Sequence, residues 1–291
     1  MLDNKQMSKH ITKYIFALLA VLVLFNSCKK EYEKIEEIDD AKIQAFIKQN
    51  GISAVKDETG FYYQILDQGA GEPMLNKDSV FYTMTIKSLT GSVYYTTAAN
   101  TYERGYLGYV APDSYRIALN AINRGGKVRV IVPSYLAYGK NGNDIVPSNE
   151  VIVGELTVAS EKTQWEIEDR LIREFLTAKN LTGFIKHPSR VYQNISVVGN
   201  GTIINSSSTL TLKYKGRLLD GTQFDESGTN DLVNAIYDLR PGLRKSLVGI
   251  SKGTKLRIFV PSDLGYGSVA DGPIPANSIL DFDIEVVDVV N

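Results

Sequence analysis

A repeat with a spacing of about 129 residues constrains this chain more than any other feature of its sequence. The segment IDDAKIQAFIKQNGI, from Ile38, aligns with IEDRLIREFLTAKNL, from Ile167. Both copies place apolar residues at i, i+3 and i+4, as in Ile43, Phe46 and Ile47, which is typical of a helix with one buried stripe. Each is followed by alternating strands, a Gly-centred hairpin, a Pro-initiated turn and a Tyr-Gly pair. We therefore predict a helix followed by a β-rich domain, twice.

The length and composition agree with two globular domains. The chain has 291 residues, of which 43% are hydrophobic and 22% are charged. The repeat places the first domain at residues 38–160 and the second at 161–291, with the boundary near Ser160–Thr163. The fold class predicted for each is α+β.

The N-terminus differs from the rest of the chain. Tyr14–Phe25 is a run of apolar residues behind three lysines, too short to span a bilayer comfortably but typical of a signal peptide. It leads into Cys28, the only cysteine, as in a bacterial lipoprotein signal. We expect residues 1–27 to be removed, Cys28 to carry lipid and the charged residues 28–37 to form a tether. An ordinary signal peptide or a short anchor with an incidental Cys is the alternative.

The sequence lacks the residues that most classes of enzymatic reaction require. After residue 27 there is one histidine, His187, directly before a proline, so neither a His/Cys metal site nor a His-activated nucleophile is expected. Phosphate-binding glycine motifs are absent, and a net charge of −1 gives no sign of a nucleic-acid partner. We predict no cofactor and no metal. Asp281 and Asp283 alternate on one strand and are expected to lie on a solvated face.

The second copy keeps a set of aromatic and apolar residues at strand ends and hairpins. In order these are Tyr214, the pair Phe224–Asp225 after an Asp-Gly turn, LRPGL from Leu239 to Leu243, GYG around Tyr266, IPANS from Ile274, and Phe282. This order resembles the FKBP-type peptidyl-prolyl isomerases over about residues 195–290. The resemblance implies two FKBP-like domains, each a curved antiparallel sheet around a short helix and each preceded by an amphipathic helix.

The resemblance also implies a role for each residue. Tyr214 and Phe224 would line a shallow proline pocket, Asp225 would orient its polar edge, Tyr266 would offer its hydroxyl to a substrate carbonyl, and Phe282 would contact the proline. Leu239, Arg240, Leu243 and Ile274 would bind substrate. Phe224 as a half-buried hairpin aromatic and Asp225 as a turn cap are the alternatives.

Two positions depart from the family pattern. Leu243 stands where the family has the Trp that floors the pocket, and Arg240 stands where it has an Ile. We therefore expect either low activity or an altered preference for the residue before proline.

The first copy keeps the turns but changes the pocket. Met84, Tyr94, Tyr95, Tyr115 and Gly154 stand at the positions of Tyr214, Phe224, Asp225, Leu243 and Phe282, and only Tyr138 matches Tyr266. We expect a degenerate domain without catalytic activity. Its other tyrosines, Tyr102, Tyr106 and Tyr109, would form with Tyr94 and Tyr95 a surface for a protein partner, or would fill the core instead.

These expectations combine into one function. The chain would be a prolyl isomerase for exported polypeptides in the bacterial envelope, active through its second domain and anchored by lipidated Cys28 to a membrane, the outer rather than the inner one. The alternative is a non-catalytic peptide-binding or assembly lipoprotein that uses both domains as scaffolds.

Overall fold

The computed structural model describes residues 35–291, which form two compact units. The first unit extends to Ser160, apart from Ala99–Thr101, and the second unit begins at Glu161 in the chain. Each unit starts with a helix, continues through a seven-stranded antiparallel sheet and packs one short helix against that sheet. The expected Cys28 and tether fall almost entirely outside the described residues.

The first unit begins with helical residues 35–49. Its further elements are β1 (Val55–Lys56), β2 (Tyr62–Asp67), β3 (Ser79–Ser88), β4 (Val93–Thr96), β5 (Glu103–Tyr106), α2 (Asp113–Asn120), β6 (Lys127–Val132) and β7 (Ile152–Val158). The second unit consists of α3 (Gln164–Ala178), β8 (Ile185–Lys186), β9 (Tyr192–Val197), β10 (Thr209–Leu218), β11 (Gln223–Glu226), β12 (Leu232–Ala235), α4 (Pro241–Leu247), β13 (Lys255–Val260) and β14 (Leu280–Val290).

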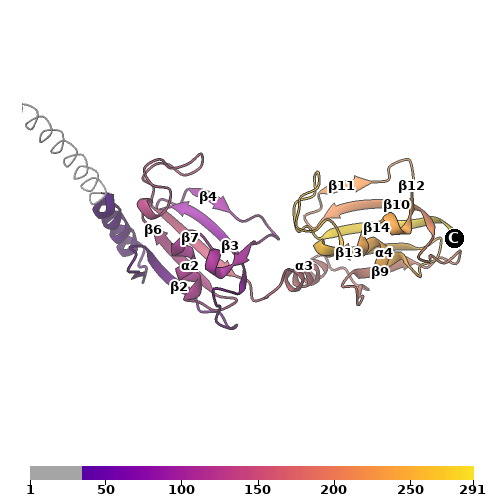
Figure 1. The fold of residues 1–291 in the computed structure, drawn as a ribbon, viewed down its shortest axis with the longest axis horizontal. Helices are drawn as coiled ribbons and strands as arrows, with labels where there is room; N and C mark the ends of the chain where they lie inside the picture. The colour runs from indigo at the N-terminus through magenta and orange to yellow at the C-terminus, as the bar shows by residue number, and fades with distance from the viewer. Residues whose placement is uncertain (1–34) are drawn as a thin grey trace, which may run out of the picture. The chain divides into compact units, whose positions relative to one another are not determined.

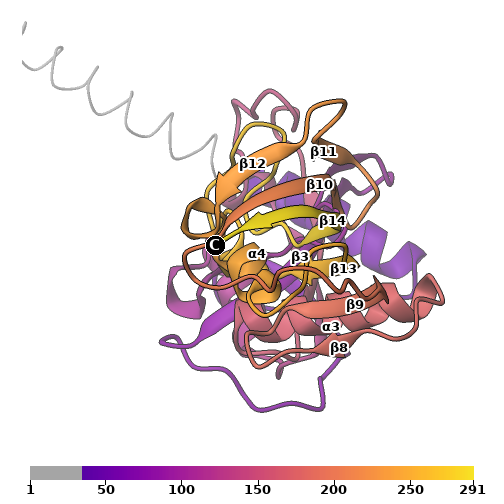
Figure 2. The same ribbon diagram turned by 90° about the vertical axis from the view of Figure 1, so that its right-hand side faces the viewer.

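The two sheets have the same topology (Figure 1). The first runs β1-β2-β6-β7-β3-β4 with β5 also paired to β3, and the second runs β8-β9-β13-β14-β10-β11 with β12 also paired to β10. Figure 2 shows this second order, with α4 enclosed by the curve of the sheet and α3 beside β9 and β8. The repeat in the sequence is therefore a repeat of structure, strand by strand.

A buried acid fixes each leading helix to its sheet. Asp39 accepts hydrogen bonds from the backbone N–H of Ser134 at 2.8 Å and from its hydroxyl at 2.6 Å. Glu168 in α3 accepts the equivalent bonds from Ser262, and both of these residues are buried. Because each serine follows the proline that comes directly after β6 or β13, the contact holds the helix at the same end of both sheets.

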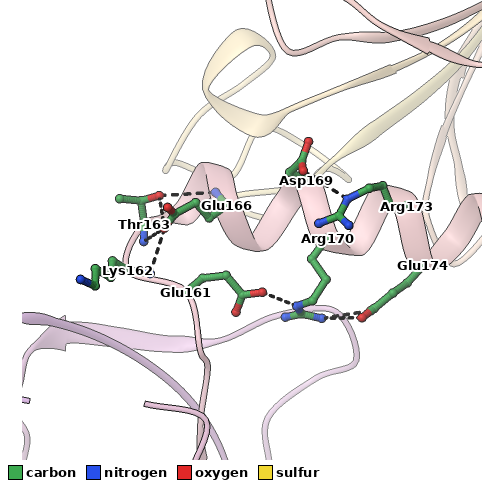
Figure 3. A network of polar contacts seen from close by, with 8 residues as sticks. All are labelled: Glu161, Lys162, Thr163, Glu166, Asp169, Arg170, Arg173 and Glu174. Carbon is green, nitrogen blue, oxygen red and sulfur yellow. Dashed lines mark hydrogen bonds and ion pairs between the residues drawn. The ribbon is translucent and has the colours of Figure 1, made fainter. Parts of the chain in front are cut away.

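The N-terminus of α3 is capped by local polar contacts, drawn in Figure 3. Thr163 accepts a hydrogen bond from the N–H of Glu166, whose carboxylate accepts one from the N–H of Thr163 at 3.0 Å. This capping box satisfies backbone N–H groups that the helix leaves unpaired. Arg170 bridges Glu161 and Glu174, which connects the chain before the helix to its middle. The N-terminus of α3 is therefore stabilised by contacts among residues of the second unit itself.

The outer faces of both sheets carry ion pairs, and here one expectation was wrong. Asp281 is 2% exposed rather than solvated, because the guanidinium of Arg257 donates to it twice at 2.8 Å and Arg217 donates at 3.2 Å. Asp283, its neighbour on the same face, is half exposed and pairs with Arg217. The two carboxylates are therefore parts of an ion-pair network, in which each is held by arginine.

Glu155 has the matching role in the first sheet. Its carboxylate lies 2.8 Å from Arg129, 3.2 Å from Lys127 and 3.7 Å from Lys87. Burial alone would raise the pKa of Glu155, but hydrogen bonds from Arg129 and Lys127 and the charge of Lys87 outweigh it and lower the pKa to about 2. A carboxyl whose pKa is lowered on folding stabilises the fold above its unfolded pKa of about 4.3, and that stability is lost as the pH falls towards 2.

We therefore predict that Glu155→Gln lowers the free energy of unfolding by about 1–2 kcal/mol at pH 7, with the difference shrinking as the pH falls from about 5 to 2. Urea unfolding of the variant and the unchanged chain across this range measures it. Glu174→Gln is the matched control, because Glu174 is 58% exposed and its pair with Arg170 should contribute less than about 0.5 kcal/mol. A constant difference at all pH values would contradict the role assigned to Glu155.

Candidate active site

Three adjacent strands of the second sheet bring the aromatic residues together. Gly216 on β10 is the Cα partner of both Asp225 on β11 and Phe282 on β14. The Phe282 ring lies edge-on to the Phe224 ring with centroids 5.5 Å apart, and 6.4 Å from the ring of Tyr214. Phe282 is 5% exposed and lies deepest, whereas the rings of Tyr214 and Phe224 are only partly buried and pack against it from the solvent side.

Only a glycine fits at position 216. A Cβ there would lie 2.6 Å from Cζ of Phe224 and 2.9 Å from Cε1 of Phe282, inside van der Waals contact. The missing side chain is therefore what lets the two rings meet over β10.

A hydrogen bond fixes the polar edge of this group. The hydroxyl of Tyr214 donates to Oδ2 of Asp225 at 2.6 Å, and the N–H of Glu226 donates to Oδ1 at 2.9 Å. Burial and the hydrogen bond to Asp225 both raise the pKa of Tyr214, so its hydroxyl stays protonated as the donor. The structure thus places Asp225 as the acceptor that orients the Tyr214 ring.

The start of α4 and the turn after β13 supply the opposite wall. Leu239 is buried, and Leu243 packs against the core from the first turn of α4. The guanidinium carbon of Arg240 lies 4.2 Å from the ring centroid of Tyr266, and its Nη2 lies 3.4 Å from Asp271. Stacking of this kind is a cation–π contact, which shields one face of the tyrosine ring.

These residues surround a hollow of about 170 Å³. Eight of the nine residues that the sequence pointed to line it, while Ile274 is buried in the core beside it. Sequence reasoning missed four lining residues, Leu212, Asn234, Asp238 and Ile284, whereas the fifth, Leu232, is an apolar candidate that the sequence offers between Gly228 and Leu239. Leu212 and Ile284 each lie two positions from a predicted residue on the same strand, so strand alternation was the signal that could have found them. No such pattern marks Asp238.

The arrangement suits binding and desolvation rather than covalent chemistry. Its walls are largely aromatic and aliphatic, and its polar groups are the Tyr214–Asp225 pair, the guanidinium of Arg240, the hydroxyl of Tyr266 and the side chains of Asn234 and Asp238. Among residues 35–291 no cluster of three metal-ligating side chains occurs. An X–Pro bond needs no nucleophile to rotate, and a water-poor pocket favours the less polarised, twisted amide over the planar one.

The equivalent place in the first unit is filled. Ile86 on β3 takes the position of Gly216, and its Cα partner on β7 is Gly154, at the position of Phe282. Tyr115, the third residue of α2, is 3% exposed, and its hydroxyl would lie 3.4 Å from a Cβ built on Gly154. Burial raises the pKa of Tyr115. The large and the small residue of this pair are thus exchanged between the two units. In the first unit, Tyr115 and Ile86 occupy the space that corresponds to the hollow of the second unit.

The tyrosines of the first unit divide between core and surface. Tyr94 packs partly buried against the core, whereas Tyr106 and Tyr109 are 57% and 87% exposed. Tyr95 is exposed and donates its hydroxyl to Glu103. A protein partner on this surface stays a prediction.

Comparison with known proteins shows that part of the second unit is similar to a family. Residues 201–287 match the family model of FKBP-type peptidyl-prolyl cis-trans isomerases. An isomerase of that type, FkpA from Buchnera aphidicola subsp. Schizaphis graminum, is 38% identical over 114 residues, which are 38% of this chain and 45% of that protein. FkpA from Escherichia coli strain K12 is 39% identical over 101 residues, 34% of this chain and 37% of that protein.

One solved structure is among the matches. The crystal structure of FkpA from Escherichia coli matches at 32% identity with a TM-score of 0.39, covering 43% of this chain and 58% of that one. The matched segments span only about half or less of the curated relatives' own lengths. The predicted fold class, α+β with two FKBP-like domains, is confirmed, because the second unit matches the family model and the first unit has the same sheet topology. Over residues 201–287, the second domain is similar to the FKBP-type peptidyl-prolyl cis-trans isomerase family.

Proposed function

We propose that this chain is a peptidyl-prolyl cis-trans isomerase that acts through its second domain on exported, proline-containing polypeptides. The observation that carries the proposal is the hollow in which Tyr214, Phe224 and Phe282 converge, together with its filled counterpart at Ile86 and Tyr115. The proline ring would lie against Phe282, with Phe224 and Leu243 as walls.

The rate enhancement would come from the environment of the amide. Resonance gives the X–Pro bond its rotational barrier, of about 18–20 kcal/mol. Loss of water around the bond favours the twisted state, and a fixed donor near the displaced carbonyl favours it further. Tyr266 at the rim is the side chain we assign as that donor, which requires its hydroxyl to remain accessible beneath the stacked Arg240.

We further propose that the protein works in the cell envelope, held by lipid on Cys28, at the outer membrane. The support is the apolar run before Cys28 and the absence of any other cysteine from the sequence. Among the described residues, none of the helices is long and apolar enough to cross a bilayer. Labelling with a radioactive fatty acid, compared between the natural chain and Cys28→Ala, tests this anchor.

A second candidate function is a binding module that grips proline-containing segments without catalysis. Arg240 favours it, because its stacking on Tyr266 and its contact with Asp271 place charge at the rim of the hollow. Deleting residues 38–160 and measuring client binding and turnover separates the candidates. Isomerisation by the shortened chain supports the enzyme, whereas binding without turnover supports the module.

A further inference from the structure

The outer face of the second sheet carries an ordered ladder of charges. Along β14, the acids Asp281, Asp283 and Glu285 are the Cα partners of Arg217, Lys215 and Lys213 on β10. On its other side, β13 places Lys255 opposite Glu285 and Arg257 opposite Asp283. One acidic row therefore lies between two basic rows, and five basic residues face three acids.

The unbalanced charge is concentrated on β10. Arg257 and Arg217 are paired with Asp281 and Asp283, and Lys255 lies 3.1 Å from Glu285. Lys213 and Lys215 are both exposed, and neither forms an ion pair with any residue in 35–291. Glu226 on β11 lies opposite Lys215 and reduces the excess without removing it.

A hollow of about 630 Å³ crosses this same face. Leu181 and Phe184, in the loop after α3, border it at one end, and Ser227 and Gly228 border it at the other. Between these ends it spans β9, β13, β14, β10 and β11, which at about 4.8 Å per strand is about 19 Å. At about 3.3 Å per residue, this length holds five or six residues of extended polypeptide.

The hollow lies on the opposite face of the sheet from the proline pocket, and the two share Tyr214 and Ile284 as lining residues, on the two central strands β10 and β14. The N–H of Ser227 donates to the carbonyl of Tyr214 at 3.1 Å, so the far end of the groove lies two residues from Asp225. Because β11 is the edge strand of the sheet, a polypeptide that leaves the pocket past β11 reaches the groove by turning around this edge.

From this geometry we infer that the groove is a second polypeptide site, which binds an extended, acidic segment flanking the proline of the same client. Lys213 and Lys215 on β10 would bind its carboxylates, and Phe184, at the end of the groove near β9, would contact an apolar side chain further along the segment. The inference rests on the proposed isomerase function, because it assigns the groove to the flanks of the substrate of that pocket.

The test compares two substrates of the full chain. One is a proline tetrapeptide, too short to leave the pocket, and the other carries the same tetrapeptide joined to six residues rich in glutamate. The double variant Lys213→Gln/Lys215→Gln is expected to raise KM for the long peptide about three- to tenfold at low salt, with kcat unchanged, because two exposed ion pairs are lost. It should leave the tetrapeptide unaffected, and high salt should remove the difference.

The matched control is Lys245→Gln/Lys252→Gln, which makes the same change in net charge outside the groove and should change neither substrate. The proposed binding site in the groove would be contradicted if both double variants had the same KM for the long peptide, or if the groove variant lost the same amount of kcat/KM on both peptides.

Fluorescence anisotropy of a labelled glutamate-rich peptide without proline separates this proposal from the isomerase proposal. Binding that weakens in the groove variant alone supports the groove even without turnover, and failure of either peptide to isomerise counts only against the isomerase.

Discussion

Replacing Phe224 with alanine is expected to lower kcat/KM for prolyl isomerisation by about tenfold to a hundredfold. The ring stands edge-on to Phe282 at 5.5 Å and forms one wall of the hollow, so its loss opens the pocket to water and removes contact with the proline. Each factor of ten corresponds to about 1.4 kcal/mol of transition-state stabilisation. Phe224 is only half buried, so the fold should survive.

The repeat provides a matched control for this change. Tyr94 occupies the same position on β4 as Phe224 on β11, and it too is half buried against its core. Tyr94→Ala should leave the isomerase rate within about twofold, because Tyr115 and Ile86 already fill the place in the first unit that corresponds to the hollow. Equal isomerisation rates for Phe224→Ala and the unchanged chain would contradict the assignment of Phe224 to the active site.

Gly216→Ile is expected to abolish measurable isomerisation and to cost about 1–3 kcal/mol of stability. Its Cβ would lie 2.6 Å from the ring of Phe224, and the rest of the side chain would enter the hollow. Isomerase assays and urea unfolding of the same preparation measure both effects.

A second variant shows whether the two effects share one cause. Gly216→Ile/Phe282→Gly reproduces the Ile86–Gly154 pair of the first unit. Because the two residues are direct neighbours, their effects on stability should not add, and the double variant should be more stable than the sum of the single changes predicts. Activity should remain absent. Restored activity in the double variant would contradict the assignment of Phe282 as the floor of the site.

The repeat of a helix followed by a β-rich domain could be predicted because it depends on local pattern, whereas the residues of the pocket were predicted from the resemblance to a family. Alternation along β10 and β14 and the glycine turns between strands recur at a fixed spacing, and this recurrence by itself indicates two similar sheets. Alternation brings Tyr214 and Phe282 to one face, since Gly216 lies two residues after Tyr214 and is the Cα partner of Phe282. Phe224 joins them where the register between β10 and β11 shifts after Gly216, which the alternation alone does not predict.

Features that depend on side chains meeting across the fold could not be predicted. Nothing in the sequence places the guanidinium of Arg240 on Tyr266, because the two lie in separate loops. Asp281 was expected in solvent, and only the convergence of Arg217 and Arg257 from both neighbouring strands explains its burial. The filled first pocket likewise depends on the third residue of α2 reaching over Gly154.

The central claim is that one of two similar domains catalyses prolyl isomerisation. The most direct test is the isomerisation rate of a proline tetrapeptide with the separate fragments 161–291 and 35–160, each first shown to be folded by circular dichroism. We predict that 161–291 catalyses at a rate close to that of the full chain and that 35–160 stays at the uncatalysed rate. Equal catalysis by the two fragments, or none by a folded 161–291, would contradict the account.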